Sequence, residues 1–197
     1  VTYSGPGWNR LRNENVSWEV GHKLDIGFDL QLFNALDITF DWFRERRSNI
    51  FQQKLSIPNY LGTANTKIYG NLAEVINKGV DLGVNYSKRI NKDLSIQFQG
   101  TFTYNNNEIS VYDEAPGKRD AMKSQGKNVK TVWGYVANGL YIDKADIANN
   151  PTSTLGNIAI APGDIKYVDQ PDRDGKYDGR ITADDQVPLG VSVPKII

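Results

Sequence analysis

The sequence has no cysteine among its 197 residues, which excludes disulfide frameworks, thiolate catalysis and zinc–thiolate sites. Its single histidine, His22, excludes histidine-rich metal sites. Neither sign of charge is in excess, because 23 lysines and arginines balance 23 aspartates and glutamates. A nucleic-acid-binding protein would need a basic surplus. No run approaches ~18 apolar residues, so no transmembrane helix is expected, although β-strands can also cross a membrane.

The strongest positive signal is strict alternation of apolar and polar residues in four segments. Alternation with period two, in segments rich in aromatic and β-branched residues, is typical of β-strands, and no comparable helical stripe is present. The segments are Lys23–Leu32, Leu36–Trp42, Val80–Ser87 and Leu94–Asn105. The sequence therefore predicts an all-β, antiparallel protein.

Strand length and loop length narrow the class of β protein. The first and fourth segments run about ten to twelve residues, longer than the ~5–6 of an average soluble strand and close to the ~9–11 of a transmembrane strand. Within each pair the connection is short, whereas a long segment separates the two pairs. This pattern is typical of outer-membrane barrels. A soluble β-sandwich with two long hairpins would give a similar pattern, so both folds stay open at this point.

Several phrases, in collinear order over nearly the whole chain, resemble the SusC-like branch of the TonB-dependent outer-membrane receptors. The phrases are Asn13 to Glu19 (NENVSWE), Ile26 to Asn34 (IGFDLQLFN), Asp41 to Phe43 with Asn49 to Phe51, Gly70-Asn71, Glu74 to Asp81 (EVINKGVD), Trp133 to Tyr135, Asn138 to Leu140, Pro162 to Tyr167, and Gly190 with Pro194. The phrase from Glu74 to Asp81 is the most specific. Each phrase alone is weak, but their shared order makes the resemblance strong.

The resemblance implies a fragment from the C-terminal part of a roughly 22-stranded transmembrane β-barrel with long extracellular loops. The chain opens at Val1 without methionine, which also fits a fragment. Residues 1–105 would supply antiparallel barrel strands with one long loop at 44–79. Residues 106–197 would form an extracellular loop and hairpin region. The implied location is the outer membrane, and the implied partners are a SusD-like surface lipoprotein, TonB through parts outside this chain, and outer-membrane lipid.

The two faces of the predicted strands differ in polarity as a barrel wall requires. The even-numbered apolar positions are expected to face lipid, while Asp25, Asp29, Gln31, Gln97 and Gln99 would line a wet lumen. Aromatic residues gather toward the strand ends, as interfacial girdles would. They are Phe40, Trp42, Phe43, Tyr86, Phe102 and Tyr104.

An aspartate-rich loop at residues 163–185 is the one candidate metal site. Asp178-Gly179-Arg180-Ile181 resembles the centre of an EF-hand-type loop, with Asp174 as first ligand and Asp184 or Asp185 as the closing carboxylate. Residues inserted around Arg173 to Tyr177 depart from the family phrase DxNGDGxIxxxD, and Lys176 falls on a ligand position. Bound Ca²⁺ and a hydrogen-bonded aspartate turn are the two interpretations.

The signals for catalytic or ligand-binding residues elsewhere in the sequence are weak, and no enzymatic activity is expected. Closely spaced acids on a glycine-rich loop show no apolar setting of the kind a glycosidase acid needs. Trp133, Tyr135 and Tyr141 are weak candidates for stacking against a sugar or peptide. The sequence thus predicts part of a TonB-dependent importer of a nutrient ligand, a glycan or a peptide. The alternative is a secreted, soluble β-sandwich that binds carbohydrate.

Overall fold

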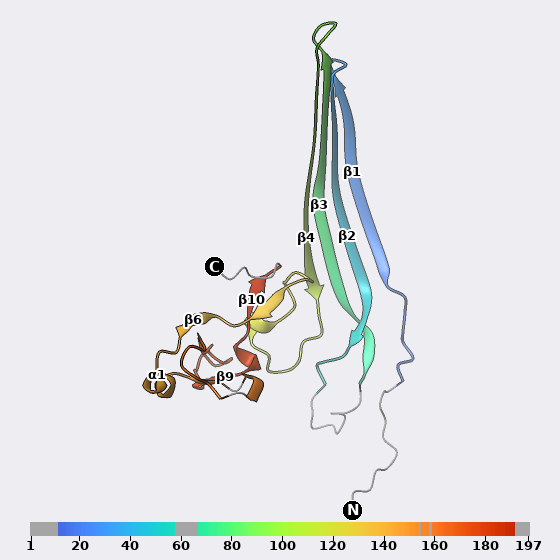
Figure 1. The fold of residues 1–197 in the computed structure, drawn as a ribbon. Helices are drawn as coiled ribbons and strands as arrows, with labels where there is room; N and C mark the ends of the chain where they lie inside the picture. The colour runs from blue at the N-terminus through green and yellow to red at the C-terminus, as the bar shows by residue number, and fades with distance from the viewer. Residues whose placement is uncertain (1–11, 58–66, 154, 158, 192–197) are drawn as a thin grey trace, which may run out of the picture. The chain divides into compact units, whose positions relative to one another are not determined.

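A computed structural model describes residues 12–57, 67–153, 155–157 and 159–191 (Figure 1). The chain divides into two compact units. Unit 1 comprises residues 1–54 and 58–113, and unit 2 comprises residues 55–57 and 114–197. No helix among the described residues is long and apolar enough to span a membrane.

Unit 1 is a four-stranded antiparallel meander, with the strands neighbouring one another in chain order. Its strands are β1 (Val20–Leu32), β2 (Leu36–Gln53), β3 (Tyr69–Arg89) and β4 (Ser95–Val111), seen as the long ribbon in Figure 1. The four predicted strands and their antiparallel pairing are confirmed. At the β1–β2 turn, Phe33 and Asn34 both have positive φ (54° and 49°), as the mirror-image hairpin turns require.

The strand register sorts the side chains of this sheet into an apolar face and a polar face. The apolar face consists of four successive rows, each running across all four strands. These rows are Leu32–Leu36–Tyr86–Phe98, Leu30–Ile38–Val84–Gly100, Phe28–Phe40–Leu82–Phe102 and Ile26–Trp42–Val80–Tyr104. Between them, on the polar face, lie rows such as Gln31–Asp37–Asn85–Gln99 and Asp29–Thr39–Gly83–Thr101. The alternation along each strand is therefore matched across strands, which gives one continuous apolar surface.

The strands extend further than the apolar pattern predicted. Residues 44–53 and 69–79, which the sequence suggested were loop, continue β2 and β3, so the connection between these strands is residues 54–68. Strand β4 likewise continues past residue 105 to Val111. Backbone pairing persists there although apolar residues no longer alternate regularly with polar ones, and ion pairs such as Lys23–Glu45 (3.7 Å) and Arg46–Glu74 (2.6 Å) bridge neighbouring strands. Period-two hydrophobicity marks only the part of a strand that has an apolar face.

One predicted girdle aromatic lies on the opposite face of the sheet. Phe43 is directly opposite Gly79, in a row with Asp25 and Asn105, and so belongs to the polar face. Its ring lies over Gly79, where a Cβ would collide with the Phe43 ring and with the Tyr104 carbonyl oxygen. Phe43 therefore covers a glycine and is not part of the aromatic row that contains Trp42 and Tyr104.

Three of the phrases noted in the sequence meet in unit 1. The Asn71 side chain accepts a hydrogen bond from the Ser17 N–H (2.9 Å) and donates to the carbonyls of Ser17 (2.8 Å) and Asn49 (2.6 Å). Asn13 donates from its side chain to the Tyr69 carbonyl (2.8 Å). The segment before β1 is thus fastened to the start of β3 by amide side chains that imitate backbone pairing.

Unit 2 is built from short elements joined by turns. They are the 3₁₀ turn η2 (Asp120–Met122), β5 (Val132–Gly134), β6 (Ala137–Leu140), α1 (Lys144–Ala148), β7 (Thr152–Ser153), η3 (Leu155–Asn157), β8 (Ile165–Tyr167), β9 (Arg180–Ile181), η4 (Ala183–Asp185) and β10 (Val187–Gly190). Strand β5 pairs with β10 and β6 with β8, both antiparallel, and β7 pairs with β9 in parallel. Among its described residues, the buried hydrophobic side chains are Tyr141 and Ile181, exposed by 3% and 0%.

Candidate functional site

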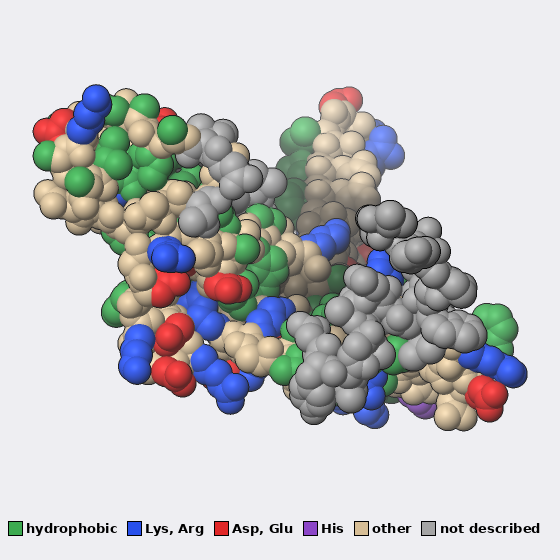
Figure 2. Space-filling model, turned by 90° about the horizontal axis from the view of Figure 1, so that it is seen from below, with side chains coloured by type: hydrophobic (Ala, Val, Ile, Leu, Met, Phe, Trp, Pro, Cys, Tyr) green, Lys and Arg blue, Asp and Glu red, His purple; other side chains and the backbone are tan. Residues whose placement is uncertain are grey.

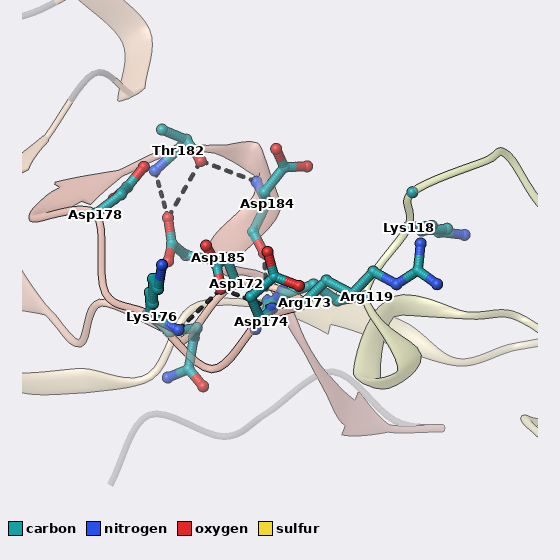
Figure 3. Close-up of a pocket in the computed structure, with 12 residues that line it drawn as sticks. Lys118, Arg119, Asp172, Arg173, Asp174, Lys176, Asp178, Thr182, Asp184 and Asp185 are labelled. Carbon is teal, nitrogen blue, oxygen red and sulfur yellow. Dashed lines mark hydrogen bonds between the residues drawn. The ribbon is translucent and has the colours of Figure 1, made fainter. Parts of the chain in front are cut away.

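The aspartate-rich loop lies in unit 2 and borders a polar pocket of about 260 Å³ (Figure 3). Both signs of charge line this pocket. Its charged side chains are Lys118, Arg119, Arg173, Lys176, Asp172, Asp174, Asp178, Asp184 and Asp185. In Figure 3, Lys118 and Thr182 lie on opposite sides of the cluster, and dashed lines join Thr182 to the carboxylate of Asp185 and the N–H of Asp184. The pocket is therefore a mixed ionic surface with no single preferred sign.

Asp185, predicted as a closing metal ligand, caps a 3₁₀ turn. One carboxylate oxygen accepts from the Gln170 N–H (2.8 Å), and the other accepts from the Thr182 N–H (2.6 Å) and hydroxyl (3.2 Å). Thr182 and Asp185 form a reciprocal capping box around η4. Because these donors already occupy both oxygens of a side chain that is 4% exposed, Asp185 has a structural role in this conformation.

The inserted residues form a turn of their own around Asp172. Its carboxylate accepts from the N–H groups of Asp174 and Lys176, both at 2.8 Å. Gly175 takes a positive φ of 77°, and its N–H donates to the Asp172 carbonyl (3.1 Å). Further on, Asp178 accepts from the Arg180 N–H (2.8 Å). The loop is thus two consecutive aspartate-capped turns, which accounts for its departure from the shorter family phrase.

Among the described residues of the loop, Asp169 is the aspartate with a buried, unpaired carboxylate oxygen. The side chain is 8% exposed, and one oxygen accepts from the Gly179 N–H (2.9 Å). The other oxygen is buried without a hydrogen-bond partner in the described structure. Burial raises the pKa of this carboxyl; the Gly179 N–H opposes the shift, and the neighbouring carboxylates of Asp185 and Asp178 add to it.

The four predicted calcium ligands do not converge as a metal requires. Asp174 and Asp184 are exposed, Asp178 accepts from a backbone N–H, and Asp185 is engaged by three donors. Across the described part of the chain, no three histidine, cysteine, aspartate or glutamate side chains are grouped so that they could hold a metal ion. The donor set as arranged does not fit Ca²⁺, and the calcium site stays a prediction from the sequence.

Arg119, which no sequence motif marks, holds this loop region together. Its guanidinium donates to the carbonyls of Pro171 (3.1 Å), Gln186 (3.0 Å) and Asp184. Of these carbonyls, that of Pro171 lies directly before the two aspartate-capped turns, that of Asp184 lies within η4, and that of Gln186 follows η4. Arg119, from the segment before η2, therefore joins the part of the aspartate-rich loop near Pro171 to its end near Gln186.

The three aromatic residues proposed for ligand stacking have different surroundings. Tyr141 is buried, with Lys166 Nζ 5.6 Å from the centre of its ring, so little of the ring is open to a ligand. The Tyr135 ring packs against Tyr167 at 5.3 Å between centroids. Trp133 is half-buried in β5. Ligand contact by these residues stays a prediction, and the packing of Tyr135 and Tyr141 supplies a structural role for both.

A second ionic cluster in unit 2 centres on Asp146 of α1. Its carboxylate accepts from the Ile142 N–H (3.0 Å), from Lys166 Nζ (2.9 Å to each oxygen) and from the Asn150 amide (2.8 Å). The pKa of Asp146 lies below its usual range, mainly because its carboxylate accepts the Ile142 N–H, and the Lys166 ammonium lowers it further. A depressed pKa means that this cluster stabilises the fold above the ordinary aspartate pKa of about 4 and loses that contribution as the pH falls through the lower folded-state pKa.

We therefore expect Asp146→Asn to speed hydrogen exchange at the Ile142 amide at neutral pH. The protection of this amide should then change little as the pH is lowered. In the unchanged protein, the same amide should lose protection as the solution is acidified. Asp174→Asn is the matched control, because the Asp174 carboxylate is exposed and accepts no hydrogen bond within the described structure. Equal exchange at Ile142 in the Asp146 variant and the unchanged protein would contradict this role.

The surface seen in Figure 2 carries both signs of charge side by side, with hydrophobic side chains between them. This agrees with the balanced composition of the chain.

Comparison with known proteins identifies related receptors. The chain is 26% identical over 142 residues to TonB-dependent receptor P3 of Formosa agariphila, covering 66% of this chain and 14% of that protein. It is 27% identical over 192 residues to TonB-dependent receptor SusC of Bacteroides thetaiotaomicron, covering 85% of this chain and 18% of that protein. The chain thus spans less than a fifth of the length of either relative.

Among solved structures, the fold is similar to that of the RagAB peptide importer in its "closed-closed" state. The TM-score is 0.58 at 21% sequence identity, covering 92% of this chain and 19% of that one. A family model described as TonB dependent receptor-like, beta-barrel matches residues 2–188. The chain therefore belongs to the β-barrel family of the TonB-dependent receptors.

Proposed function

We propose that the protein containing this chain is an outer-membrane receptor that imports a nutrient ligand in a TonB-dependent manner, without enzymatic chemistry. The observation that carries the proposal is the division of unit 1 into an apolar and a polar face. Phe28, Phe98 and Phe102 on the apolar face are exposed by 56%, 59% and 57%. Side chains of this size are left uncovered across four strands where lipid is the surrounding medium.

The edges of the sheet support a larger closed barrel. In the described structure, β1 and β4 each pair with one neighbour only, so both outer edges present unpaired backbone groups. Within a bilayer such edges must be closed by further strands. From Ile96 to Tyr104, β4 places apolar-face residues over eight residue steps, about 27 Å along the strand at ~3.4 Å per residue. At a tilt of ~35–45°, that span covers about 19–22 Å of membrane thickness, which is most of an apolar band ~25 Å tall.

The ligand class we propose is a glycan or a peptide. The resemblance to SusC-like receptors favours this class, and one protein of similar fold is described as a peptide importer. As partners we propose a SusD-like surface lipoprotein, TonB acting on parts outside this chain, and outer-membrane lipid. Purification of the full-length receptor in mild detergent should recover the lipoprotein with it, and a receptor that purifies alone would overturn that part of the proposal.

The membrane assignment is tested by comparing two neighbouring residues on opposite faces. Because this chain lacks cysteine, Phe28→Cys and Asp29→Cys each introduce a thiol that is unique within it. In the full-length receptor in outer membranes, we expect Cys at position 28 to react with a lipid-soluble maleimide and to resist a charged one. Cys at position 29 should show the reverse preference.

Two outcomes would overturn the proposed function. Recovery of the full-length protein in the soluble periplasmic or secreted fraction would favour the carbohydrate-binding sandwich. Ligand uptake that persists unchanged when TonB is deleted would exclude TonB-dependent import even if the protein lies in the membrane.

A further inference from the structure

Arg44 of β2 and Lys78 of β3 are directly opposite each other in the sheet, in the row Leu24–Arg44–Lys78–Asn106. This row lies on the apolar face, immediately beyond the row that contains Trp42 and Tyr104. Two residue steps separate the rows, which is about 7 Å along the strand. Both cationic residues are exposed. The pair therefore lies where the apolar band ends on the side of the long β2–β3 connection.

Like charges directly opposite each other in a sheet are destabilising unless a counter-charge offsets them. Nearby cations do have partners: Arg46 pairs with Glu74 (2.6 Å), and Arg47 pairs with Glu45 (2.7 Å). By contrast, no ion pair or hydrogen bond to a described residue engages the side-chain nitrogens of Arg44 or Lys78. Glu74 is already held by Arg46 and by the Ser110 hydroxyl (2.7 Å). Neither cation of the pair thus forms an ion pair with a carboxylate of the described sheet.

The space between these side chains is a groove of about 300 Å³ on the same face. Its lining residues are Trp42, Arg44, Ile76, Lys78, Asn106 and Glu108. At this end of the apolar band, the groove presents the Arg44 guanidinium, the Lys78 ammonium and the Asn106 amide. Trp42 lines the groove on the side of the apolar band. Glu108, one row further from the band, is the acidic residue at its rim.

We propose that Arg44 and Lys78 bind the phosphate of an anionic outer-leaflet lipid headgroup, an inference that rests on the proposed membrane location. The apolar rows then contact the acyl chains and Trp42 and Tyr104 lie at the interface, as aromatic residues do. The phosphate meets the Arg44 fork and the Lys78 ammonium, whose geometries suit phosphate oxygens. A phosphate bridging the two cations also removes their mutual repulsion, which explains why the sheet tolerates this pair.

The test uses the full-length receptor in nanodiscs of phosphatidylcholine, with or without phosphatidic acid, and measures bound lipid by native mass spectrometry. One basic residue near an anionic surface raises the affinity about fivefold. Lys78→Gln should therefore reduce the retention of phosphatidic acid about fivefold. Adding Arg44→Gln should reduce it about thirtyfold in all. The matched control is Lys88→Gln, which changes the same residue type on the same strand and face, at the opposite end of the apolar band.

Thermal stability supplies a second readout with opposite signs in the two lipids. In phosphatidylcholine alone, Lys78→Gln should raise the melting temperature because it relieves the repulsion with Arg44. With phosphatidic acid present, the same variant should melt lower than the unchanged receptor. A Lys88→Gln variant that loses as much lipid, a Lys78→Gln variant that loses none, or equal stabilisation by inorganic phosphate without anionic lipid would overturn the proposal.

Failure of this inference is distinguishable from failure of the proposed function. If the thiol at position 28 reacts with the lipid-soluble reagent while Lys78→Gln leaves lipid retention unchanged, the proposed membrane location holds and the proposed phosphate site is wrong. If that thiol reacts only with the charged reagent, the membrane location itself fails.

Discussion

Replacing Ile38 with arginine should prevent or strongly impair insertion of the receptor, whereas the same change at the adjacent Thr39 should be tolerated. Ile38 lies in the second apolar row, between Leu30 and Val84, within the band assigned to lipid. An arginine on the lipid face of a barrel costs about 2–4 kcal/mol near the bilayer midplane. Thr39 lies between Asp29 and Gly83 on the polar face, where an arginine keeps its hydration.

The measurement is the amount of heat-modifiable, folded receptor in outer membranes for the two variants, expressed at the same level. Folding into lipid vesicles under increasing urea then gives the difference in unfolding free energy. Because the two positions are consecutive in one strand, strand propensity and distance from the turn are closely matched between them. Equal loss in both variants, or a greater loss for Thr39→Arg, would mean that the faces are assigned the wrong way round.

This contrast between neighbours also shows how much of unit 1 could be predicted from sequence. Alternation alone assigns Ile38 and Thr39 to opposite faces, because side chains on a strand have a period of two. Applied to Phe43, the same parity would have placed it on the polar face, but its aromatic character led to the girdle prediction instead. The structure supplies the reason for an aromatic residue there, since Gly79 leaves a space that the Phe43 ring covers.

The strand ends and the loop contacts could not be predicted in the same way. Beyond Trp42 and before Val80, charged and polar residues interrupt the apolar ones on both faces of the sheet, so hydrophobic periodicity disappears although the backbone ladder continues. In the aspartate-rich loop, composition identified the acidic residues but not their partners. Most of those partners are backbone N–H groups, such as that of Gln170 for Asp185, and their positions depend on the folded path of the loop.

Replacing Arg119 with alanine should unfold the aspartate-rich loop locally. The substitution leaves the carbonyls of Pro171, Asp184 and Gln186 without the guanidinium that now joins them. Hydrogen bonds from a charged donor each contribute about 1.5–3 kcal/mol, and the three share one partly exposed side chain, so we expect a loss of about 3–5 kcal/mol in local stability. The expected signature is much faster hydrogen exchange over residues 169–186 of the full-length receptor, with exchange in the strands of unit 1 unchanged.

Arg173→Ala is the matched control, because Arg173 lines the same pocket but is exposed and makes no ion pair or hydrogen bond with a described residue (Figure 3). Surface substitutions of this kind usually change stability by less than about 0.5 kcal/mol. Arg119→Lys separates charge from geometry: an ammonium keeps the charge but lacks the planar fork that reaches three carbonyls, so it should restore only part of the protection. If Arg119→Lys behaves like the unchanged protein, the positive charge alone stabilises the loop. If Arg119→Ala leaves exchange over residues 169–186 unaltered, the turns capped by Asp172 and Asp185 hold the loop without it.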